Sequence, residues 1–443
     1  MKELIPQKMK NIYHLFQAVL ANIWYEFPSR KLKIIGVTGT NGKTTTCQMI
    51  TRILEEAGHK VAMISTINFK LGKKEWVNKT KFTTLSSFAT QKFIRKAVEE
   101  NCDYLVLETS SHSLDQNRVW GIKYDVAVVT NVTREHFDYH RTIEKYRKAK
   151  MKLFRMVSKS KGILIANLNM ENPEEFLKYK AKEKYGYAAK LPIPHFSFPI
   201  KSQLRLIIAK EIELGINFSK FKVHDLKFKI NLPGDFNIEN ALAALSVGIS
   251  QEISLEAIAK ALEKIKGVPG RFEYIPNSRG FNIIIDYAVT PDSLEKFYAL
   301  ISKTKQLGAR IIAVLGSCGE RDRGKRPIMG KIVSRFADYA IVTNEDPYGE
   351  NPQKIINEVF KGVISTDKSK ITNPGIYEKH KQEGVSCWRI PSRREAIKKA
   401  LRLAGPGDIV AITGKGAEVT MAVGKKRILW NDRRVIEEEL EKI

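Results

Sequence analysis

Long apolar runs are missing from this chain of 443 residues, and none approaches the ~20 residues that a helix needs to span a bilayer. Cysteine is scarce as well: its four residues lie far apart and form no C-x-x-C pair. This spacing argues against a zinc site or a disulfide framework and favours a reducing, cytoplasmic setting. The net charge is +27, yet no Arg-rich arm, zinc-finger spacing or RNA-binding aromatic motif accompanies it. We therefore expect no nucleic-acid partner, but a field that attracts anionic ligands.

The first 32 residues contain one short apolar stripe at helical spacing. Its members are Leu15, Phe16, Val19, Leu20, Ile23 and Trp24. Polar residues interrupt the run and no small-residue cleavage site follows cleanly, so a signal peptide is not expected. Such a stripe either packs on its own protein or lies on a membrane surface. We expect packing, because stripes of this kind usually face a core.

From Lys33 onward, short apolar runs alternate with helical stretches. This alternation predicts α/β architecture with a mostly parallel sheet and helices on both faces. The region from Phe196 to Lys229 has shorter alternating runs that favour antiparallel strands. A second α/β alternation follows the "VPGRFE" segment. We expect a helical segment at 1–32, a central domain at 33–267 of the phosphate-loop type, and a Rossmann-like domain at 268–443.

A glycine-rich loop joins the first expected strand to the first helix of the central domain, in "IIGVTGTNGKTTTCQMI". Its glycines, Gly36, Gly39 and Gly42, do not fit the common spacing Gly-x-x-x-x-Gly-Lys-Thr, which would need glycine at Val37. The strand–loop–helix context nevertheless predicts a nucleotide site, with phosphate oxygens at the helix N-terminus. Lys43 would reach the outer phosphates. A tight turn with a solvated lysine is the alternative.

Nine motifs in order give the chain a resemblance to the Mur ligases, and most to the branch that adds the third amino acid to the peptidoglycan precursor. They are GVTGTNGKTTT, ETSSHSLDQNRV, TNVTREHFDYH, YRKAKMKLF, LPGDFNIENALAA, VPGRFE, DYAVTPDSLE, GSCGERDRGKRP and TGKGAE. The resemblance runs from about Lys33 to the C-terminus, and its own glycine pattern, TGTNGKTT, removes the objection at Val37.

The resemblance implies an ATP-dependent amide ligase that acts on UDP-N-acetylmuramoyl-L-alanyl-D-glutamate and a free amino acid through an acyl phosphate. Its implied metal ligands for Mg²⁺ are Thr44, Glu108, His136 and a carbamylated Lys150. Together with Lys43, the last three are the implied catalytic residues. The residues implied to hold ATP are Gly39, Thr40, Asn41, Gly42, Lys43, Thr44, Thr45, Asn240, Arg271 and Asp286. Those implied to hold the two other substrates are Thr83, Thr84, Ser111, His112, Gln116, Arg118, Asp346, Tyr348, Gly414 and Glu418.

Several of these residues also have simpler interpretations. Lys150 alone would be one more charge on a basic helix face, and Glu108 a strand-end carboxylate at the surface. Arg271 would be a salt bridge at a domain junction. The segment "RDRGKRP", 321–327, is expected to form a basic loop, and its simpler interpretation is a solvated charge run.

The chain departs from the family pattern at four places. The segment before Gly36 reduces the usual UDP-gripping domain to about one helix, Val289 replaces a histidine, and Glu135 replaces an aspartate. Tyr348 stands where diaminopimelate enzymes have arginine. A phenol does not reproduce a guanidinium fork, so we expect lysine or another diamine as the amino acid, although Lys325 or Arg326 would be near enough to bind a distal carboxylate.

Two other functions remain open at this point. A related ligase, such as a folylpolyglutamate synthase, would fit the reduced N-terminal segment, whereas "SSHSLDQNRV" argues against it. A non-catalytic ATP- or polyanion-binding module would fit the charge, whereas Lys43, Glu108, His136 and Lys150 argue against it. We expect a cytoplasmic monomer without a transmembrane segment.

Overall fold

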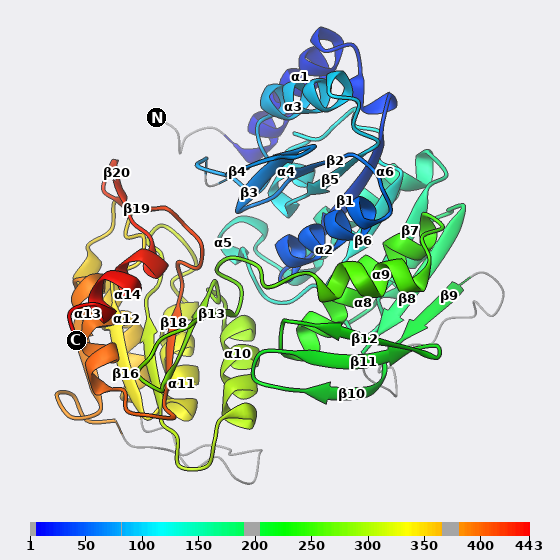
Figure 1. Cartoon of the computed structure of the whole chain (residues 1–443). Helices are drawn as coiled ribbons and strands as arrows, with labels where there is room; N and C mark the ends of the chain where they lie inside the picture. Colours follow the sequence, from blue (N-terminus) through cyan, green and yellow to red (C-terminus); the bar gives the residue numbers. More distant parts are fainter. Residues whose placement is uncertain (1–5, 81, 190–203, 366–380) are drawn as a thin grey trace. The chain divides into compact units, whose positions relative to one another are not determined.

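The computed structural model describes residues 6–80, 82–189, 204–365 and 381–443. The chain divides into two compact units, coloured from blue to green and from green to red in Figure 1. The first consists of Met1–Glu135, His140–Leu214 and Phe218–Lys266, and the second of His136–Tyr139, Gly215–Asn217 and Gly267–Ile443. None of the helices built from the described residues combines the length and hydropathy needed to cross a bilayer.

The first unit is built on a nine-stranded sheet in the order β4-β3-β2-β5-β1-β6-β7-β8-β9. Seven strands from β2 to β9 run parallel, and β3 and β4 extend one edge as an antiparallel hairpin. The strands are β1 Lys33–Thr38, β2 Val61–Ile64, β3 Asn68–Leu71, β4 Lys74–Val77, β5 Tyr104–Glu108, β6 Val126–Val129, β7 Ile163–Asn167, β8 Glu183–Ala188 and β9 Leu204–Ile208. The predicted mostly parallel sheet is confirmed.

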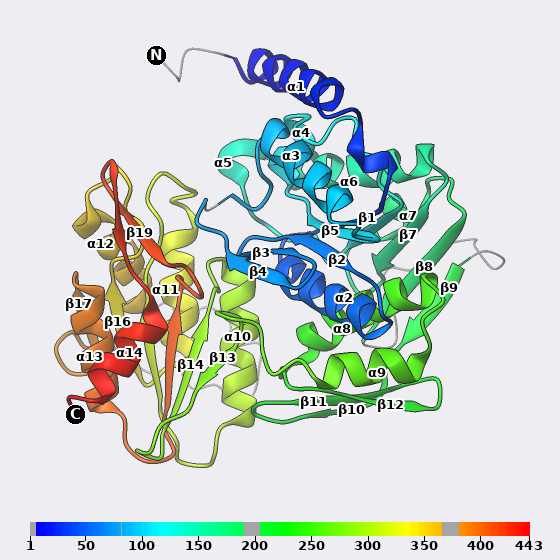
Figure 2. The same cartoon turned by 45° about the horizontal axis from the view of Figure 1, so that its top comes forward.

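Helices cover both faces of this sheet (Figure 2), as the alternating pattern predicts. Those of the first unit are α1 Gln7–Trp24, α2 Lys43–Glu56, α3 Ser87–Glu99, α4 Ser111–Asp115, α6 Ile143–Lys159, α7 Glu174–Leu177, α8 Asp235–Ser250 and α9 Leu255–Glu263, with the short 3-10 helix η1 at Pro28–Arg30. Helices α3, α4, α6 and α7 share one core with the sheet. On the other side α2 packs against α8 and α9.

The region expected to be antiparallel is so only in part. Strands β10 Lys210–Leu214, β11 Ser219–Val223 and β12 Leu226–Ile230 form a separate antiparallel sheet. Strand β9, just before them, instead pairs parallel to β8 and extends the main sheet. The first residues of the expected region, 196–203, lie outside the described residues.

The expected packing of the α1 stripe is wrong for most of its members. Phe16, Leu20, Ile23 and Trp24 are exposed, and the buried residues of the helix are Ala18, Ala21 and Asn22. Helix α1 lies beside α3 and turns its small and polar side toward the unit. The periodicity of the sequence locates the apolar stripe, but it does not predict which side of the helix packs against the rest of the protein.

The second unit contains a six-stranded sheet in the order β13-β14-β18-β15-β16-β17, parallel except for β13. Its strands are β13 Glu273–Ile275, β14 Asn282–Asp286, β15 Ile311–Leu315, β16 Tyr339–Thr343, β17 Cys387–Ile390 and β18 Ile409–Thr413, and a separate hairpin is formed by β19 Thr420–Val423 and β20 Lys426–Leu429. Its helices are α10 Pro291–Thr304, α11 Lys325–Phe336, α12 Pro352–Val363, α13 Arg393–Leu403 and α14 Asp432–Leu440. This is the Rossmann-like alternation that the sequence predicts.

Candidate active site

The glycine-rich loop leaves the carboxyl end of the central strand β1 and opens helix α2. Gly42 is the N-cap of α2 with φ 83°, and a Cβ there would lie 2.2 Å from Oδ1 of Asn240 on α8. A Cβ at Gly39 would lie 1.8 Å from Oγ1 of Thr130. Both positions therefore need glycine, for conformation at Gly42 and for close approach at both. Asn240 touches the loop directly.

The turn after β6 holds this loop in place. The backbone N–H of Thr40 donates to the carbonyl of Asn131 at 2.9 Å, and the N–H of Asn41 donates to Oδ1 of Asn131 at 2.9 Å. Thr130 Oγ1 donates to the carbonyl of Asn41 at 2.6 Å. Thr45 is buried in the first turn of α2. A loop fixed by so many bonds is organised before any ligand arrives.

Two lysines converge on the carbonyl of Gly39. Lys43 Nζ donates to it at 3.1 Å and to the carbonyl of Thr40 at 2.7 Å. Lys150 Nζ, from α6, donates to the same Gly39 carbonyl at 2.6 Å, and lies 4.2 Å from the ring centroid of Tyr146. Lys150 is almost completely buried, which rules out its interpretation as a charge on an exposed helix face.

The protonation of Lys150 is perturbed by its surroundings. Burial lowers the pKa of its amine well below the ordinary value for lysine, and the positive charge of Lys43 lowers it further, whereas Glu135 opposes the shift. The lowered pKa increases the fraction of this amine in its neutral, nucleophilic form.

Glu108 ends β5, next to β1 in the sheet, and is buried rather than at the surface. Its carboxylate accepts hydrogen bonds from Thr44 Oγ1 at 3.0 Å, from the N–H of Thr66 at 2.7 Å and from Thr66 Oγ1 at 2.8 Å. Thr66 Oγ1 also lies 3.0 Å from Oγ1 of Thr83. Sequence reasoning missed Thr66, which follows a strand but belongs to no recognised motif.

The other residues matched to the muramoyl substrate gather on α4 and the segment before α3. Thr84 Oγ1 donates to the carbonyl of Glu108 at 3.0 Å, and Arg118 Nη1 donates to the carbonyl of Thr84 at 2.8 Å. Ser111 Oγ lies 3.1 Å from Nε2 of His140. His112, Gln116 and Arg118 belong to α4 or the turn that follows it.

His140 itself was missed, and its ring lies 5.4 Å from that of His112. Burial lowers the pKa of His140 to about 4, so the ring is neutral near pH 7. The neutral ring shares a hydrogen bond with the hydroxyl of Ser111. His136, four residues earlier, precedes the short helix α5 Phe137–His140 with φ 56°. Among the described residues no three His, Cys, Asp or Glu side chains gather as a metal cluster.

In the second unit, Asp286 ends β14 and accepts a hydrogen bond from the N–H of Phe272 at 2.7 Å. Burial raises the pKa of Asp286 to about 6, although Arg271 opposes the shift. The guanidinium of Arg271 lies 4.6 Å from the ring centroid of Tyr287. Gly414 donates its N–H to the carbonyl of Asp286, which ties the loop after β18 to the end of β14.

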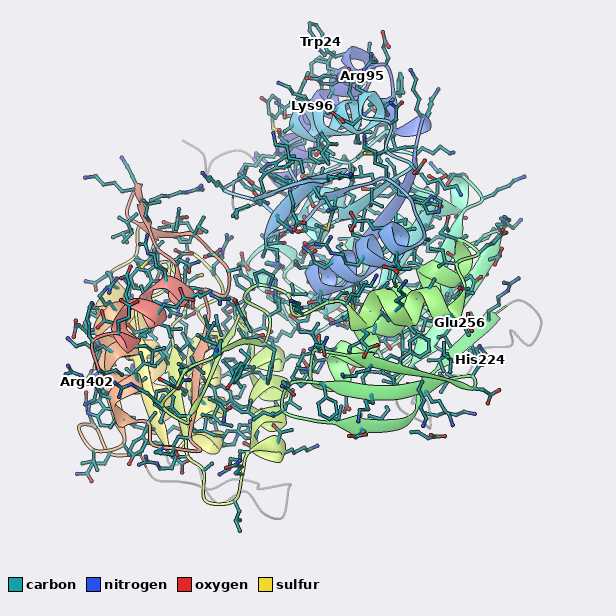
Figure 3. The ribbon with its side chains drawn as sticks, viewed as in Figure 1. Trp24, Arg95, Lys96, His224, Glu256 and Arg402 are labelled. Atoms are coloured by element: carbon teal, nitrogen blue, oxygen red, sulfur yellow. The ribbon has the colours of Figure 1, made fainter. Side chains whose placement is uncertain are left out.

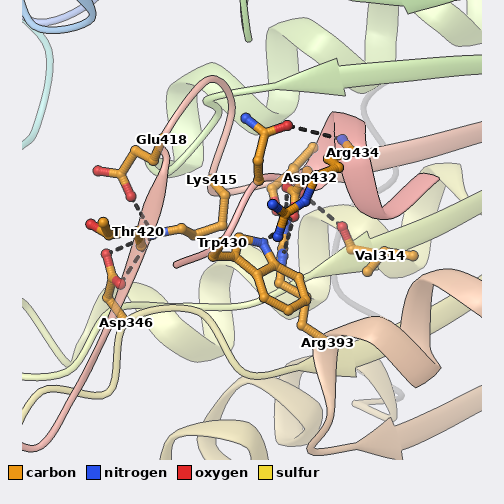
Figure 4. Close-up of polar contacts among 11 residues, drawn as sticks. Val314, Asp346, Arg393, Lys415, Glu418, Thr420, Trp430, Asp432 and Arg434 are labelled. Carbon is orange, nitrogen blue, oxygen red and sulfur yellow. Dashed lines mark hydrogen bonds and ion pairs between the residues drawn. The ribbon is translucent and has the colours of Figure 1, made fainter. Parts of the chain in front are cut away.

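Lys415 organises the end of this sheet (Figure 4), and sequence reasoning missed it. The side chain is completely buried, and Nζ lies 3.0 Å from both carboxylate oxygens of Asp346. It also pairs with the carboxylate of Glu418 and donates to the carbonyl of Thr420 at 2.8 Å. Asp346 and Glu418, expected to hold the incoming amino acid, thus share one lysine. The middle residue of the "GKG" string was the available signal.

A second buried network supports the same strand ends. Arg393 donates from Nε and Nη2 to Asp432 at 2.8 and 2.6 Å, and from Nη2 to the carbonyl of Thr413 at 3.0 Å (Figure 4). Cys318 Sγ donates to Glu345 Oε1 at 2.9 Å, and burial raises the pKa of Glu345. Neither pair was anticipated, because each joins segments far apart in the sequence.

The structure shows how Tyr348 is held, and it differs from expectation at one residue of the basic segment. Tyr348 has φ 50°, and its N–H donates to the carbonyl of Ala422 on β19 at 3.2 Å. Arg326, expected in a basic loop, is instead completely buried in the first turn of α11 and pairs with Glu350 and Glu358, which also rules out a solvated charge at this position. It is therefore committed to these carboxylates and is not available to an amino-acid ligand.

Lys325 is also engaged, because its Nζ donates to the carbonyl of Val289 at 2.8 Å. The backbone carbonyl is therefore the group of Val289 that contacts Lys325. The side chain of Val289 supplies no polar group there.

Family models match both units. The Mur ligase middle domain matches residues 37–248, and the Mur ligase, glutamate ligase domain matches residues 270–416. The UDP-N-acetylmuramoyl-L-alanyl-D-glutamate–2,6-diaminopimelate ligase of Syntrophomonas wolfei is 36% identical over 428 residues, 96% of this chain and 81% of that protein. The UDP-N-acetylmuramyl-tripeptide synthetase of Roseiflexus sp. is 35% identical over 94% of this chain and 80% of that protein.

Solved structures share the same fold. A UDP-N-acetylmuramoyl-L-alanyl-D-glutamate–2,6-diaminopimelate ligase matches with a TM-score of 0.59 and 27% identity, over 93% of this chain and 78% of that one. The MurF ligase of Thermotoga maritima, solved in complex with ADP, matches with a TM-score of 0.65 and 18% identity, over 96% and 84%. The Escherichia coli FolC structure matches at 20% identity, which shows a shared fold and does not favour the folylpolyglutamate alternative. The chain belongs to the Mur ligase family of ATP-dependent amide ligases.

Proposed function

We propose that this protein adds the third amino acid to UDP-N-acetylmuramoyl-L-alanyl-D-glutamate in peptidoglycan synthesis, at the expense of ATP. The observation that carries the proposal is the pairing of Lys150 with the phosphate loop. A mere nucleotide-binding module has no need of a buried lysine with a lowered pKa at the carbonyl of Gly39. The relatives at 35–36% identity carry names of this activity.

The reaction couples two transfers. An oxygen of the substrate carboxylate attacks the γ-phosphorus of ATP, ADP leaves, and an acyl phosphate forms. The amine of the amino acid then attacks the acyl carbon, phosphate leaves, and the amine gives up a proton. The first transfer brings an anionic carboxylate up to an anionic triphosphate, so the site must supply positive charge and fixed donors.

The phosphate loop supplies these in our proposal. The N-terminus of α2 presents backbone N–H groups and the positive end of its dipole to the phosphates of ATP. Lys43 exchanges the carbonyls of Gly39 and Thr40 for the outer phosphates. We place Asn240, Arg271 and Asp286 at the nucleoside end, with Gly39 to Thr45 around the phosphates.

The residues present fit Mg²⁺, which prefers oxygen ligands and keeps part of its shell for substrate phosphates and water. Thr44 and Glu108 offer a hydroxyl and a carboxylate that already lie 3.0 Å apart. His136 and Lys150 complete the proposed ligand set. When bound, Mg²⁺ neutralises charge on the phosphates and on the substrate carboxylate.

Lys150 suits this set only after modification, because an ammonium would repel the metal. Its neutral amine attacks CO₂, a proton leaves, and the product is a carbamate anion. The lowered pKa favours this reaction, since only the unprotonated amine is nucleophilic.

The remaining substrate roles follow the two units. We place the muramoyl peptide against Thr83, Thr84, Ser111, His112, Gln116 and Arg118 in the central domain. The incoming amino acid is assigned to Gly414, Asp346, Glu418 and Tyr348 in the C-terminal domain.

Our proposed domain limits remain 1–32, 33–267 and 268–443. We propose a cytoplasmic monomer, in keeping with ATP use and with free thiols at Cys47, Cys102, Cys318 and Cys387.

The test is incubation with ATP, Mg²⁺, UDP-N-acetylmuramoyl-L-alanyl-D-glutamate and a panel of amino acids, read by phosphate release and product mass. We expect phosphate release that depends on both co-substrates and a product one amino acid heavier. Lys43→Ala is expected to lower turnover by at least about 100-fold, because the outer phosphates lose their cation. The exposed Lys73→Ala is the matched control and should be unaffected. ATP hydrolysis that ignores the muramoyl substrate, or an active Lys43→Ala enzyme, would refute the assignment.

A further inference from the structure

Helix α1 presents its apolar side outward. Ile12, Tyr13, Phe16, Leu20, Ile23 and Trp24 are each between 41% and 75% exposed. At 100° per residue all six fall within an arc of about 120°, so they form one continuous face along the helix. Figure 2 shows α1 at the edge of the first unit, and Trp24 projects outward from it in Figure 3.

The opposite side of α1 is fastened by polar contacts. Asn22 is completely buried, and its Nδ2 donates to the carbonyls of Ala18 and Trp120, both at 2.8 Å. Gln91 of α3 donates to Oδ1 of Asn22 at 3.0 Å, and Asn11 Nδ2 donates to the carbonyl of Asp115 at 3.1 Å. These bonds fix the rotation of the helix. The apolar face is thus held outward by the fold.

The surroundings of this face are cationic. Helix α1 has two lysines and no acidic residue. In α1, η1 with its flanks, and α3, cationic side chains outnumber carboxylates: Lys8, Lys10, Arg30, Lys31, Lys92, Arg95 and Lys96 stand against Glu26 and Glu99, and both carboxylates pair with Arg95. Arg95 and Lys96 of α3 lie toward the same end of the unit as Trp24 in Figure 3. A second copy of the same face would bring like charges together.

We propose that α1 docks this protein on an anionic lipid surface. The six apolar side chains enter the boundary between headgroups and acyl chains, where Trp and Tyr rings are favoured. The flanking lysines and arginines meet lipid phosphates, which attract basic residues near the surface. Such a helix lies on the membrane and does not cross it, in agreement with its length and hydropathy.

The experiment is co-sedimentation of the full chain with vesicles of phosphatidylcholine, with or without phosphatidylglycerol. We expect binding to the anionic vesicles, weakened by salt, and little binding to phosphatidylcholine alone. The triple variant Ile12→Gln/Phe16→Gln/Ile23→Gln should bind about tenfold less or weaker still. Leu307→Gln/Leu429→Gln, which removes exposed leucines of the second unit, is the matched control and should bind as the unmodified chain does.

Three outcomes overturn the proposal. The first is no binding to anionic vesicles. The second is binding that is equal with both lipids or unchanged in the triple variant. The third is a dimer, seen by light scattering without lipid, that the triple variant converts to a monomer, because α1 would then belong to a second copy. Circular dichroism and thermal unfolding verify that the variants are folded, as expected for substitutions at exposed positions.

Discussion

Lys150 has the most specific chemistry assigned to any residue of this site. If it carries a carbamate, Lys150→Ala should lower kcat by about 100-fold or more, because the metal loses an anionic ligand. Acetate or another short carboxylic acid should restore part of the activity by occupying the vacated volume. The exposed Lys148→Ala, on the same helix, is the control. Full activity of Lys150→Ala, or complete indifference to acetate, would remove the carbamate from the mechanism.

Tyr348 tests the choice of amino acid. The burial of Arg326 and the hydrogen bond of Lys325 engage the two cations that we expected near enough to bind a distal carboxylate. Tyr348→Arg should raise kcat/KM for diaminopimelate relative to lysine by roughly 1–3 kcal/mol, or one to two orders of magnitude. Tyr348→Phe, which adds no charge, should leave the ratio alone. A wild-type enzyme that already strongly prefers diaminopimelate, with a ratio unmoved by Tyr348→Arg, would contradict this selector.

Single residues of the site could be predicted where one continuous segment carries the signal. Gly39, Gly42, Lys43 and Thr44 could be singled out because strand, loop and helix adjoin in sequence, and the structure places them in the loop after β1 and the first turn of α2. Lys415 was not, since its meaning depends on Asp346 from another strand end. The burial of a side chain also cannot be predicted from its neighbours in the sequence. Nothing near Arg326 in the sequence indicates that Glu350 and Glu358 pair with it.

At the scale of elements, the attachment of α1 depends on one buried amide. Asn22→Leu keeps the approximate volume but leaves the carbonyl of Trp120 and the amide of Gln91 without this partner. We expect a loss of about 1–3 kcal/mol in the local stability of α1, because buried polar groups without partners are costly. Hydrogen exchange of the α1 amides should therefore accelerate.

Gln17→Ala is the control for this change, since Gln17 donates to Tyr13 within the same helix. Unchanged exchange in Asn22→Leu would show that other contacts hold the helix.

Most strands and helices of the two main sheets were predictable from local alternation, whereas the pairing of β9 was not. Its parallel pairing with β8 is a long-range choice that a short run of alternating residues does not encode.

For the whole molecule, the charge of +27 makes a kinetic prediction. ATP and the muramoyl nucleotide are anionic, so the kcat/KM for each should fall about tenfold as salt rises from roughly 0.05 to 0.5 M. The kcat/KM for the amino acid, which is not anionic, should not fall in this way and serves as the internal control. Equal salt sensitivity for all three substrates would indicate a general effect on the enzyme rather than attraction of anions.

The contact between Gly42 and Asn240 also limits how this sequence can vary. Loop and helix α8 meet so closely that a methyl group at position 42 would collide with the amide of residue 240. Thr46 donates to that same amide oxygen, so the asparagine cannot simply turn aside without losing a bond. Two positions far apart along the chain are therefore expected to covary: a lineage that loses the glycine must also shorten its partner on α8.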